Sequence, residues 1–286
     1  MISFPNGRIT LGLYVKAKRG DGFHDIETVM LPVSICDALE FVPATNGKTK
    51  IITTGIPIPG DLSENLVWKA YQLVQKELRI HSGPKSGALP PLRIHLRKGI
   101  PSGSGLAGGS SNGAFMLLML NRYFRLNLTQ SRLHTLSIEM GSDCPFFLHN
   151  KTMLVTGRGE TIESINTPDL SDYCIIIIIP PIHLSTSYAY KKVNPVSERT
   201  PLNKILELPV SGWQTQLTND FEDVIFQEHP YLEEIKTRLL NHGAVYASLS
   251  GSGSAIFGLF TDSEVVFPLQ KAFPDCRVGL YRGFHS

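Results

Sequence analysis

The sequence predicts an α+β fold in two domains, on three observations. The first third is rich in short strand-like segments separated by turn residues. The last third runs strand, helices, hairpin, helix and strand, an order typical of an antiparallel sheet with helices on one face. A change of composition lies between them at 166–169, and 286 residues are enough for two packed cores. We therefore expect one domain at residues 1–165 and a second at 166–286.

The spacing of apolar residues and the positions of turn residues predict the helices and strands of the first domain. Apolar and β-branched residues bounded by turn residues predict strands at 8–15, 28–35, 38–42, 49–54 and 92–96. Apolar residues at helical spacing predict helices over 66–78, 110–124 and 131–140, the last capped near Gln130 or Ser131. The Gly-, Ser- and Pro-rich segment 81–91 is expected to be a loop, and 153–156 with 160–165 a hairpin.

The second domain is expected to open with the buried strand 174–179. A helix follows from Asn219, with acidic residues in its first turn. The strands 244–249 and 255–260 form a hairpin around 250–254, and a helix over 263–273 precedes a last strand at 276–281.

Composition excludes several functional classes. A net charge of +2 gives no basic stripe for nucleic acid. The four cysteines are dispersed without a CxxC pair, and the nine histidines show no metal-ligand spacing, so we expect reduced thiols and no protein metal site. The first residues lack a signal peptide, and the apolar run Ile175–Ile179 is too short for a membrane span. We expect a cytoplasmic protein without nucleic-acid or membrane partners.

The segment Pro101–Asn112 predicts a phosphate-binding loop. Glycines at 103, 105, 108 and 109 let successive N–H groups point at one place, and Ser110, Ser111 and Asn112 follow where a helix begins. Unpaired N–H groups and the positive end of the helix dipole attract anions there. A flexible linker is the alternative, but a strand runs directly into the loop and an apolar helix directly out of it. No Gly-Lys-Ser/Thr follows, so this is not a Walker loop.

Three further segments contain candidate functional residues, and each also has a purely structural interpretation. Asp143, in Gly141–Phe147, is either a turn residue bonded to its own backbone or a base beside a nucleotide phosphate. Phe23 and His24 suit a planar base by stacking and hydrogen bonding, although a single histidine is more often structural. The glycine-rich Ser250–Ser254 is either a hairpin turn or a second phosphate-facing loop.

These segments resemble the GHMP small-molecule kinases. Pro101–Gly113 resembles the central motif of that family, Arg8–Tyr14 its first and Ser248–Phe257 its third. Within the family, five segments resemble the branch that phosphorylates 4-diphosphocytidyl-2-C-methyl-D-erythritol: 19–24, 64–67, 141–147, 156–160 and 219–222. The resemblance spans nearly the whole chain. It implies a GHMP kinase fold, with an N-terminal domain like ribosomal protein S5 domain 2 and a ferredoxin-like C-terminal domain.

The resemblance also implies roles for single residues. Asp143 would deprotonate the 2-hydroxyl of the substrate, with Arg8 nearby as the second catalytic residue. ATP, arriving with Mg²⁺, would contact Asn65, Lys98, Pro101, Ser102, Gly103, Ser104, Gly105, Leu106, Ala107, Gly108, Gly109, Ser110 and Ser111. The cytidine-diphosphate-linked methylerythritol of the non-mevalonate isoprenoid pathway would contact Thr10, Phe23, His24, Asp143, Tyr190, Gly251 and Ser252, and Ser254 would complete the pocket. We expect a monomer or a weak homodimer.

The chain departs from the family pattern at four positions. Arg8 replaces lysine, Thr10 replaces asparagine, Phe23 replaces tyrosine and Ala107 replaces glycine. Arginine keeps the positive charge but not the geometry of lysine, and Thr10 is too short to make both amide contacts. Ala107 is tolerable in the loop only if its φ is negative, since positive φ favours glycine. Two alternatives therefore stay open: a catalytically weakened nucleotide-binding homologue, and a kinase for another small alcohol such as mevalonate or homoserine.

Overall fold

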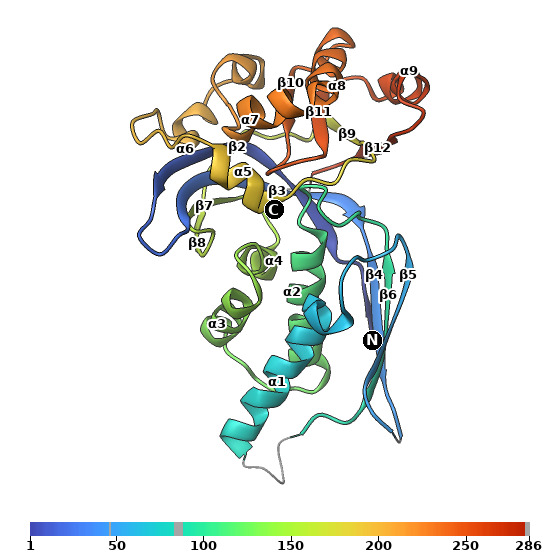
Figure 1. The fold of residues 1–286 in the computed structure, drawn as a ribbon. Helices are drawn as coiled ribbons and strands as arrows, with labels where there is room; N and C mark the ends of the chain where they lie inside the picture. Colours follow the sequence, from blue (N-terminus) through green and yellow to red (C-terminus); the bar gives the residue numbers. More distant parts are fainter. Residues whose placement is uncertain (46, 83–87, 284–286) are drawn as a thin grey trace. The chain divides into compact units, whose positions relative to one another are not determined.

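The computed structural model describes residues 1–45, 47–82 and 88–283. The chain forms two compact units, each built from three segments (Figure 1). Unit 1 contains Met1–Gly7, Ile35–Ser102 and Ala107–Asn150, and unit 2 contains Arg8–Ser34, Gly103–Leu106 and Lys151–Ser286. Both units combine helices with sheets, which confirms the α+β class. The division at residues 165 and 166 stays a prediction.

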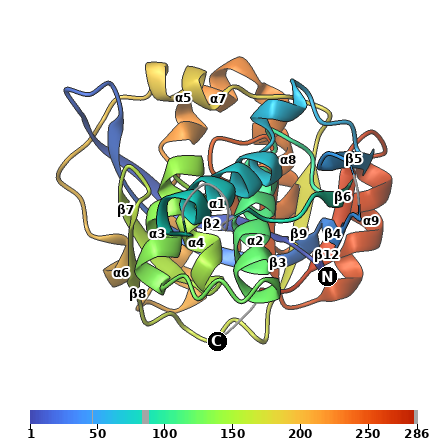
Figure 2. The same cartoon turned by 90° about the horizontal axis from the view of Figure 1, so that it is seen from below.

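Unit 1 is one four-stranded sheet with four helices. The sheet order is β1 (Ile2–Ser3), β4 (Ala38–Pro43), β6 (Leu92–Lys98) and β5 (Lys50–Gly55), with β4 antiparallel and β5 parallel to β6. Alternate residues of β6 are buried, so one face of the sheet is covered. The helices are α1 (Leu66–Ser82), α2 (Gly108–Tyr123), α3 (Gln130–Met140) and α4 (Cys144–His149), preceded by the 3₁₀ turn η1 (Leu62–Glu64). Figure 2 shows these four helices packed against one another.

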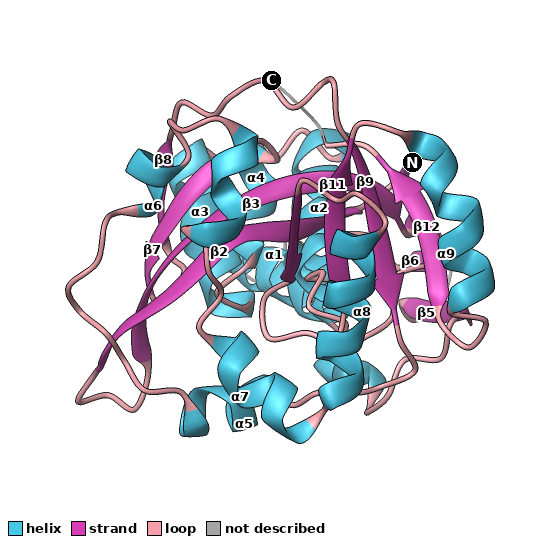
Figure 3. Ribbon diagram, turned by 90° about the horizontal axis from the view of Figure 1, so that it is seen from above, coloured by secondary structure: helices cyan, strands magenta, loops and turns pink. Residues whose placement is uncertain are grey.

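Unit 2 contains two antiparallel sheets (Figure 3). The first sheet has the order β2 (Asn6–Lys18, its first two residues in unit 1), β3 (His24–Cys36, its last two residues in unit 1), β7 (Met153–Gly157) and β8 (Thr161–Ser164). The second has the order β10 (Tyr246–Leu249), β11 (Ile256–Phe260), β9 (Cys174–Ile179) and β12 (Arg277–Tyr281). The helical segments of unit 2 are α5 (Thr186–Lys192), α6 (Leu202–Ile205), η2 (Val210–Thr215), α7 (Phe221–Glu228), α8 (Pro230–Asn241), η3 (Ser263–Val265) and α9 (Val266–Ala272). The isoleucines of β9 are buried in the core of this unit.

The predicted strands and hairpins are confirmed, whereas several helices differ from the prediction. Helix α2 begins at Gly108, two residues before the predicted start. Helix α3 is capped by Thr129, one residue before the predicted neighbourhood of Gln130 or Ser131, and its Oγ1 accepts a hydrogen bond from the Arg132 N–H at 3.2 Å. Helix α1 reaches Ser82, and residues 83–87 of the predicted loop lie outside the described residues. In the part of the chain that is described, no helix is both long and apolar enough to span a bilayer.

Sequence analysis missed helix α4. The segment was read as a turn around Asp143, followed by proline and aromatic residues. Proline is tolerated in the first turn of a helix, where its missing N–H has no partner to lose. Residues 144–147 are all buried, so packing in unit 1 stabilises a helix too short to be stable alone.

Candidate active site

The first turn of α2 forms the unit 1 part of the phosphate loop. Ala107 precedes it with φ +53° and ψ 29°, in the left-handed region, so the negative φ set as the condition for alanine is not met. The turn reverses the chain here so sharply that Ala107 adopts a conformation that usually requires glycine. The carbonyl of Ala107 accepts the N–H of Ser111 at 3.0 Å and so closes the first helical turn. The N–H groups of Gly108, Gly109 and Ser110 precede the first in-helix bond and lie at the positive end of the dipole.

The hydroxyl of Ser111 is the polar atom at this helix end that fits an anion or a cation. Its Oγ is buried and has no hydrogen-bond partner among the described residues. A buried hydroxyl without a partner costs free energy, unless a ligand supplies the missing bond. The neighbouring Ser110 is only half-buried and interacts with the thiol of Cys144.

A cavity of about 420 Å³ opens beside this helix end within unit 1. Four predicted ATP residues share its wall: Asn65, Lys98, Ser102 and Gly109. The rest of the wall is Thr53, Ile58, Pro59, Gly60, Asp61, Leu62, Glu64, Leu66 and Asn112. Its volume is that of a pocket for a small organic ligand. Asn65 itself is anchored, since its Oδ1 accepts the N–H of Val67 at 2.9 Å at the start of α1.

Lys98 belongs to a buried polar network at the base of this cavity. Its Nζ donates to the carboxylate of Asp37 and, at 3.0 Å, to Oδ1 of Asn112. Asp37 also accepts the N–H groups of Gly99 and Ile100, at 2.6 Å and 2.8 Å, which fixes the exit from β6. Burial lowers the pKa of Lys98 and the charge of Asp37 opposes that shift. Sequence analysis missed Asp37, although an isolated acid between two apolar strands could have indicated it.

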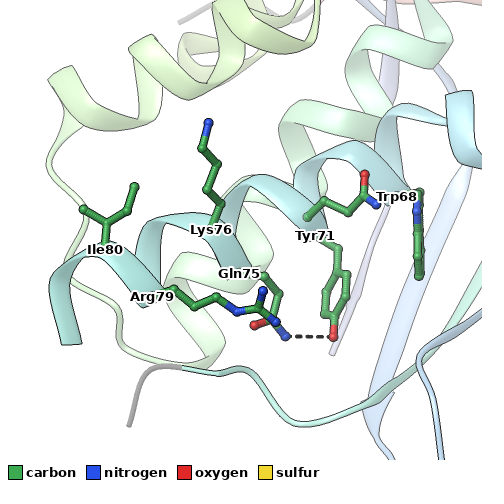
Figure 4. A pocket seen from close by; sticks show the side chains of 7 residues that line it. Trp68, Tyr71, Gln75, Lys76, Arg79 and Ile80 are labelled. Carbon is green, nitrogen blue, oxygen red and sulfur yellow. Dashed lines mark hydrogen bonds between the residues drawn. The ribbon is translucent and has the colours of Figure 1, made fainter. Parts of the chain in front are cut away.

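A second unit 1 cavity, about 580 Å³, lies along α1 (Figure 4). Its polar groups hold neighbouring segments together. Gln75 Nε2 donates to the Tyr71 hydroxyl at 2.9 Å, and its side-chain amide bonds both backbone groups of Leu89. Thr49 Oγ1 donates to the same Tyr71 hydroxyl at 2.8 Å. These bonds give the polar side chains along this cavity a structural role.

Asp143 lies immediately before α4 in unit 1. It occupies the N-cap position with φ −85°, but its side chain makes no capping bond to the helix. The role of Asp143 as a base stays a prediction. Burial, followed by the charge of Asp143, raises the pKa of the adjacent Cys144 thiol to about 12.

In unit 2, the middle of the phosphate loop is bonded to the turn 250–254. Ser250 Oγ donates to the Gly105 carbonyl at 2.8 Å, and the N–H of Ala255 donates to the Ser104 carbonyl at 3.0 Å. A Cβ at Gly105, where φ is +74°, would lie 2.0 Å from the Ser250 carbonyl oxygen, so only glycine fits. The two predicted phosphate-facing segments are thus one hydrogen-bonded assembly.

Strand β2 contributes two predicted residues to the same assembly. The buried guanidinium of Arg8 donates from Nη1 to the Gly105 carbonyl. Thr10 Oγ1 accepts the N–H of Gly251 at 2.8 Å, so this shorter side chain makes one backbone contact. Arg8 and Thr10 therefore position the backbone of the two glycine turns, a function that sequence analysis did not assign to them.

Two further residues support the turn 250–254 and were missed. Asn219 Nδ2 donates to the carbonyls of Leu249 and Gly251, both at 2.8 Å. Glu222 Oε1 accepts the Ser248 hydroxyl at 2.9 Å and the Leu249 N–H at 2.8 Å. Sequence analysis read these residues as a helix start and as part of a segment with family resemblance, and it did not assign them this supporting role.

The predicted base-binding residues also lie in unit 2. The rings of His24 and Tyr190 stack with centroids 5.1 Å apart and planes at 27°, whereas Phe23 is 52% exposed. Burial, followed by the charge of Lys18, lowers the pKa of His24 and favours the neutral ring. A neutral imidazole offers one donor and one acceptor, which suits a nucleobase edge.

The segment before Tyr190 contributes two residues that sequence analysis missed. A Cβ at Gly103 would lie 2.4 Å from the His183 ring, so this ring covers the phosphate loop. Thr186 Oγ1 and Ser252 Oγ are hydrogen-bonded at 2.9 Å. One short segment of chain therefore contacts the phosphate loop, the second glycine turn and the base-binding pair.

Comparison with known proteins identifies the family. The family model described as GHMP kinases N terminal domain matches residues 65–151, and that described as GHMP kinases C terminal matches 207–275. A 4-diphosphocytidyl-2-C-methyl-D-erythritol kinase of Azobacteroides pseudotrichonymphae is 47% identical over 91% of this chain and 93% of its own. This chain is a GHMP kinase. A relative of the same name from Parabacteroides distasonis is 42% identical over 96% of this chain and 97% of its own.

Solved structures agree with this family. A crystal structure of 4-(cytidine 5'-diphospho)-2C-methyl-D-erythritol kinase superimposes with a TM-score of 0.80 at 28% identity, over 99% of this GHMP kinase and all of that chain. A mevalonate kinase of Methanococcus jannaschii, at 12% identity and a TM-score of 0.70 over 100% of this chain and 98% of its own, shares the fold. The predicted two-domain GHMP kinase fold is confirmed. The protein is a small-molecule kinase, and membership of this family implies the use of ATP.

The structure gives this GHMP kinase no protein cage for a metal among the residues that it describes. No group of three or more His, Cys, Asp or Glu side chains there could hold an ion. The roles of the individual site residues stay predictions.

Proposed function

We propose that this kinase transfers the γ-phosphoryl group of ATP to the 2-hydroxyl of 4-diphosphocytidyl-2-C-methyl-D-erythritol, a step of non-mevalonate isoprenoid synthesis. Relatives with this activity in their names match more than nine-tenths of the chain. The observation that carries the proposal is the 420 Å³ cavity of unit 1, which ends at the first turn of α2. Its size suits a nucleoside, and the helix end suits the phosphates.

ATP would bind with its base in this cavity and its phosphates along the glycine loop. Asn65 offers an amide at the cavity wall, and Lys98 holds the wall in place through Asp37. Backbone N–H groups at the start of α2 would receive the phosphate oxygens. Mg²⁺ would enter with ATP and neutralise phosphate charge, and the hydroxyls of Ser110 and Ser111 are the protein oxygens suited to it.

Asp143 would accept the proton of the attacking hydroxyl. Its position immediately before α4, in the segment that resembles the family motif, supports this role. The transfer itself requires an in-line arrangement of the hydroxyl and the γ-phosphorus, so positioning and charge neutralisation supply most of the acceleration. Arg8 keeps a positive charge in the first motif, where it lies on the Gly105 carbonyl.

The cytosine ring would bind to the aromatic residues of unit 2. His24 would hydrogen-bond the base, and Phe23 and Tyr190 would offer ring faces for stacking. Phe23 lacks the hydroxyl of the family's tyrosine but keeps the face that stacking requires. We expect a cytoplasmic enzyme that is a monomer or a weak homodimer.

The test is ATP-dependent ADP release with three acceptors: the cytidylyl substrate, mevalonate and homoserine. The proposal expects turnover with the cytidylyl substrate and competitive inhibition by cytidine nucleotides. Turnover with mevalonate or homoserine instead, without such inhibition, would overturn it. Binding of ATP and the cytidylyl substrate without turnover, with turnover restored by Arg8→Lys and Thr10→Asn together, would identify a catalytically weakened homologue.

A further inference from the structure

The segment Thr156–Glu160 is a structured turn whose function the reaction above leaves unexplained. It joins β7 to β8, and its glycines at 157 and 159 both have positive φ, +70° and +115°. Glu160 folds back over the turn, where Oε2 accepts the N–H of Arg158 at 2.6 Å. A Cβ at Gly157 would lie 3.0 Å from both Glu160 carboxylate oxygens, so the carboxylate packs directly on this glycine. The turn therefore holds the backbone of Arg158 in one orientation.

The side chain of Arg158 lies on Phe23. Its guanidinium carbon is 4.7 Å from the Phe23 ring centroid, and Nη1 is 4.0 Å from Oδ2 of Asp21. Strand pairing brings the two residues together, because Ile26 of β3 is opposite Gly157 of β7 (Figure 3). The β2–β3 connection and the β7–β8 turn thus meet at one end of the same sheet.

The connection that carries Phe23 is itself fixed by charged groups. The N–H of Phe23 donates to Asp21 Oδ1 at 3.1 Å. Arg19 is paired with Asp21 at 3.2 Å and with Asp25 at 2.7 Å. The backbone of this tip is therefore ordered by its own residues, and the exposed Phe23 ring lies against the Arg158 guanidinium.

We propose that Arg158 is a positioning residue for recognition of the cytosine base, and that the turn 156–160 exists to present it. The guanidinium lies against one face of the Phe23 ring and leaves more than half of the side chain exposed for stacking. A cation over an exposed aromatic ring is a weak but favourable contact, and a ring ordered before binding loses less side-chain entropy when the base arrives. This inference rests on the proposed function, because it needs a pyrimidine ligand.

Direct contact between Arg158 and the substrate diphosphate is the competing explanation, and the two make different predictions. A positioning residue affects cytidine and CDP equally, because both present the same base. A diphosphate ligand affects CDP alone. The positioning effect also disappears when Phe23 is removed, since Arg158 then has no ring to hold.

The test measures the dissociation constants of cytidine and CDP by calorimetry for the full-length protein, Arg158→Gln, Phe23→Leu and the double variant. We expect Arg158→Gln to weaken both ligands by the same factor, about two- to fivefold. The factor should be close to one in the Phe23→Leu background. KM for ATP should stay unchanged in every variant, whereas KM for the cytidylyl substrate rises with little change in kcat.

Arg238 provides a matched control. Its guanidinium lies 5.4 Å from the Phe273 ring centroid and pairs with Glu234 at 2.7 Å, so Arg238→Gln removes the same kind of contact elsewhere in unit 2. That variant should bind cytidine normally. Equal effects of Arg158→Gln with and without Phe23, an effect on CDP alone, or no effect at all would each overturn the inference. Failure of the unaltered protein to bind either ligand would instead overturn the proposed function.

A measurement without ligand tests the effect of Arg158 on residue 23 separately from the proposed substrate. In a Phe23→Trp variant, loss of Arg158 should shift the indole emission to longer wavelength, because the ring gains contact with water. The Arg238→Gln change should leave that emission unchanged. Identical spectra with and without Arg158 would show that the guanidinium does not order residue 23.

Discussion

The N–H of Gly251 donates to the hydroxyl of Thr10 at 2.8 Å, with the threonine side chain fully buried. A single bond thus fastens the second glycine turn to strand β2. We expect Thr10→Val to destabilise the protein by about 1–3 kcal/mol, because it leaves a buried N–H without a partner. Urea unfolding measures the loss, and Thr10→Ser, which keeps the oxygen, is the control. Equal stability of the valine and serine variants would show that the bond contributes nothing.

Ala107 holds a left-handed conformation immediately before α2. Ala107→Gly should stabilise the protein by about 0.5–1 kcal/mol, since glycine adopts positive φ without the steric cost of a Cβ. The same change within α2, Ala114→Gly, should destabilise it by about 1 kcal/mol or more, because glycine is unfavourable in a helix. Thermal unfolding of both variants tests the opposite signs, and destabilisation at both positions would contradict the explanation.

Lys98 and Asp37 form a buried ion pair, 3% and 0% exposed by side chain. Lys98→Met should cost about 3 kcal/mol of unfolding free energy, because it leaves the Asp37 charge buried without its cation. It should also raise KM for ATP, since Lys98 lines the cavity. The control is Lys204→Met, which breaks an exposed pair with Glu207 and should have little effect. A methionine variant as stable as the parent would contradict the prediction.

The buried thiol of Cys144 should make the free energy of unfolding depend on pH in the alkaline range. Its pKa is raised from 9.0 to about 12, mainly by burial. Between these values the unfolded chain loses the proton and the folded chain keeps it, so stability falls as pH rises. The slope from this residue reaches about 1.4 kcal/mol per pH unit. Cys144→Ala should therefore lose less stability than the parent between pH 8 and pH 10 in urea titrations, and parallel curves would refute the assignment.

Asp143→Asn should lower turnover by on the order of 10²-fold or more, if the carboxylate acts as general base. The KM values should change little, because asparagine keeps the size of the side chain. Steady-state ADP release measures both parameters. Asp275→Asn, in unit 2 beside β12, serves as the control with normal turnover. Near-normal turnover of Asp143→Asn would exclude the residue as the base.

Local sequence was enough for most of the secondary structure. The hairpins 153–165 and 244–260 and the strand 174–179 follow from apolar runs between turn residues, which neighbouring residues alone decide. Helix ends were less certain. Gly108 and Gly109 discouraged an early start for α2, yet both are helical, and Gly108 packs closely against the side chain of Ile100.

The candidate functional residues divide in a similar way. The phosphate loop, Asp143 and the Phe23–His24 pair were proposed from motifs, which depend on residue type and spacing. The bonds from Asn219 to the turn 250–254 could not be read, because they join residues about thirty positions apart.

Sequence by itself therefore determined the family, the kinase chemistry and the candidate catalytic groups. Tertiary structure alone decided how those groups are held: Asp37 beneath Lys98, Arg8 on the Gly105 carbonyl, and Arg158 over Phe23. The physical reason is that such contacts depend on which distant segments pack together. A side chain's type restricts its possible partners, but only burial and strand register select one of them.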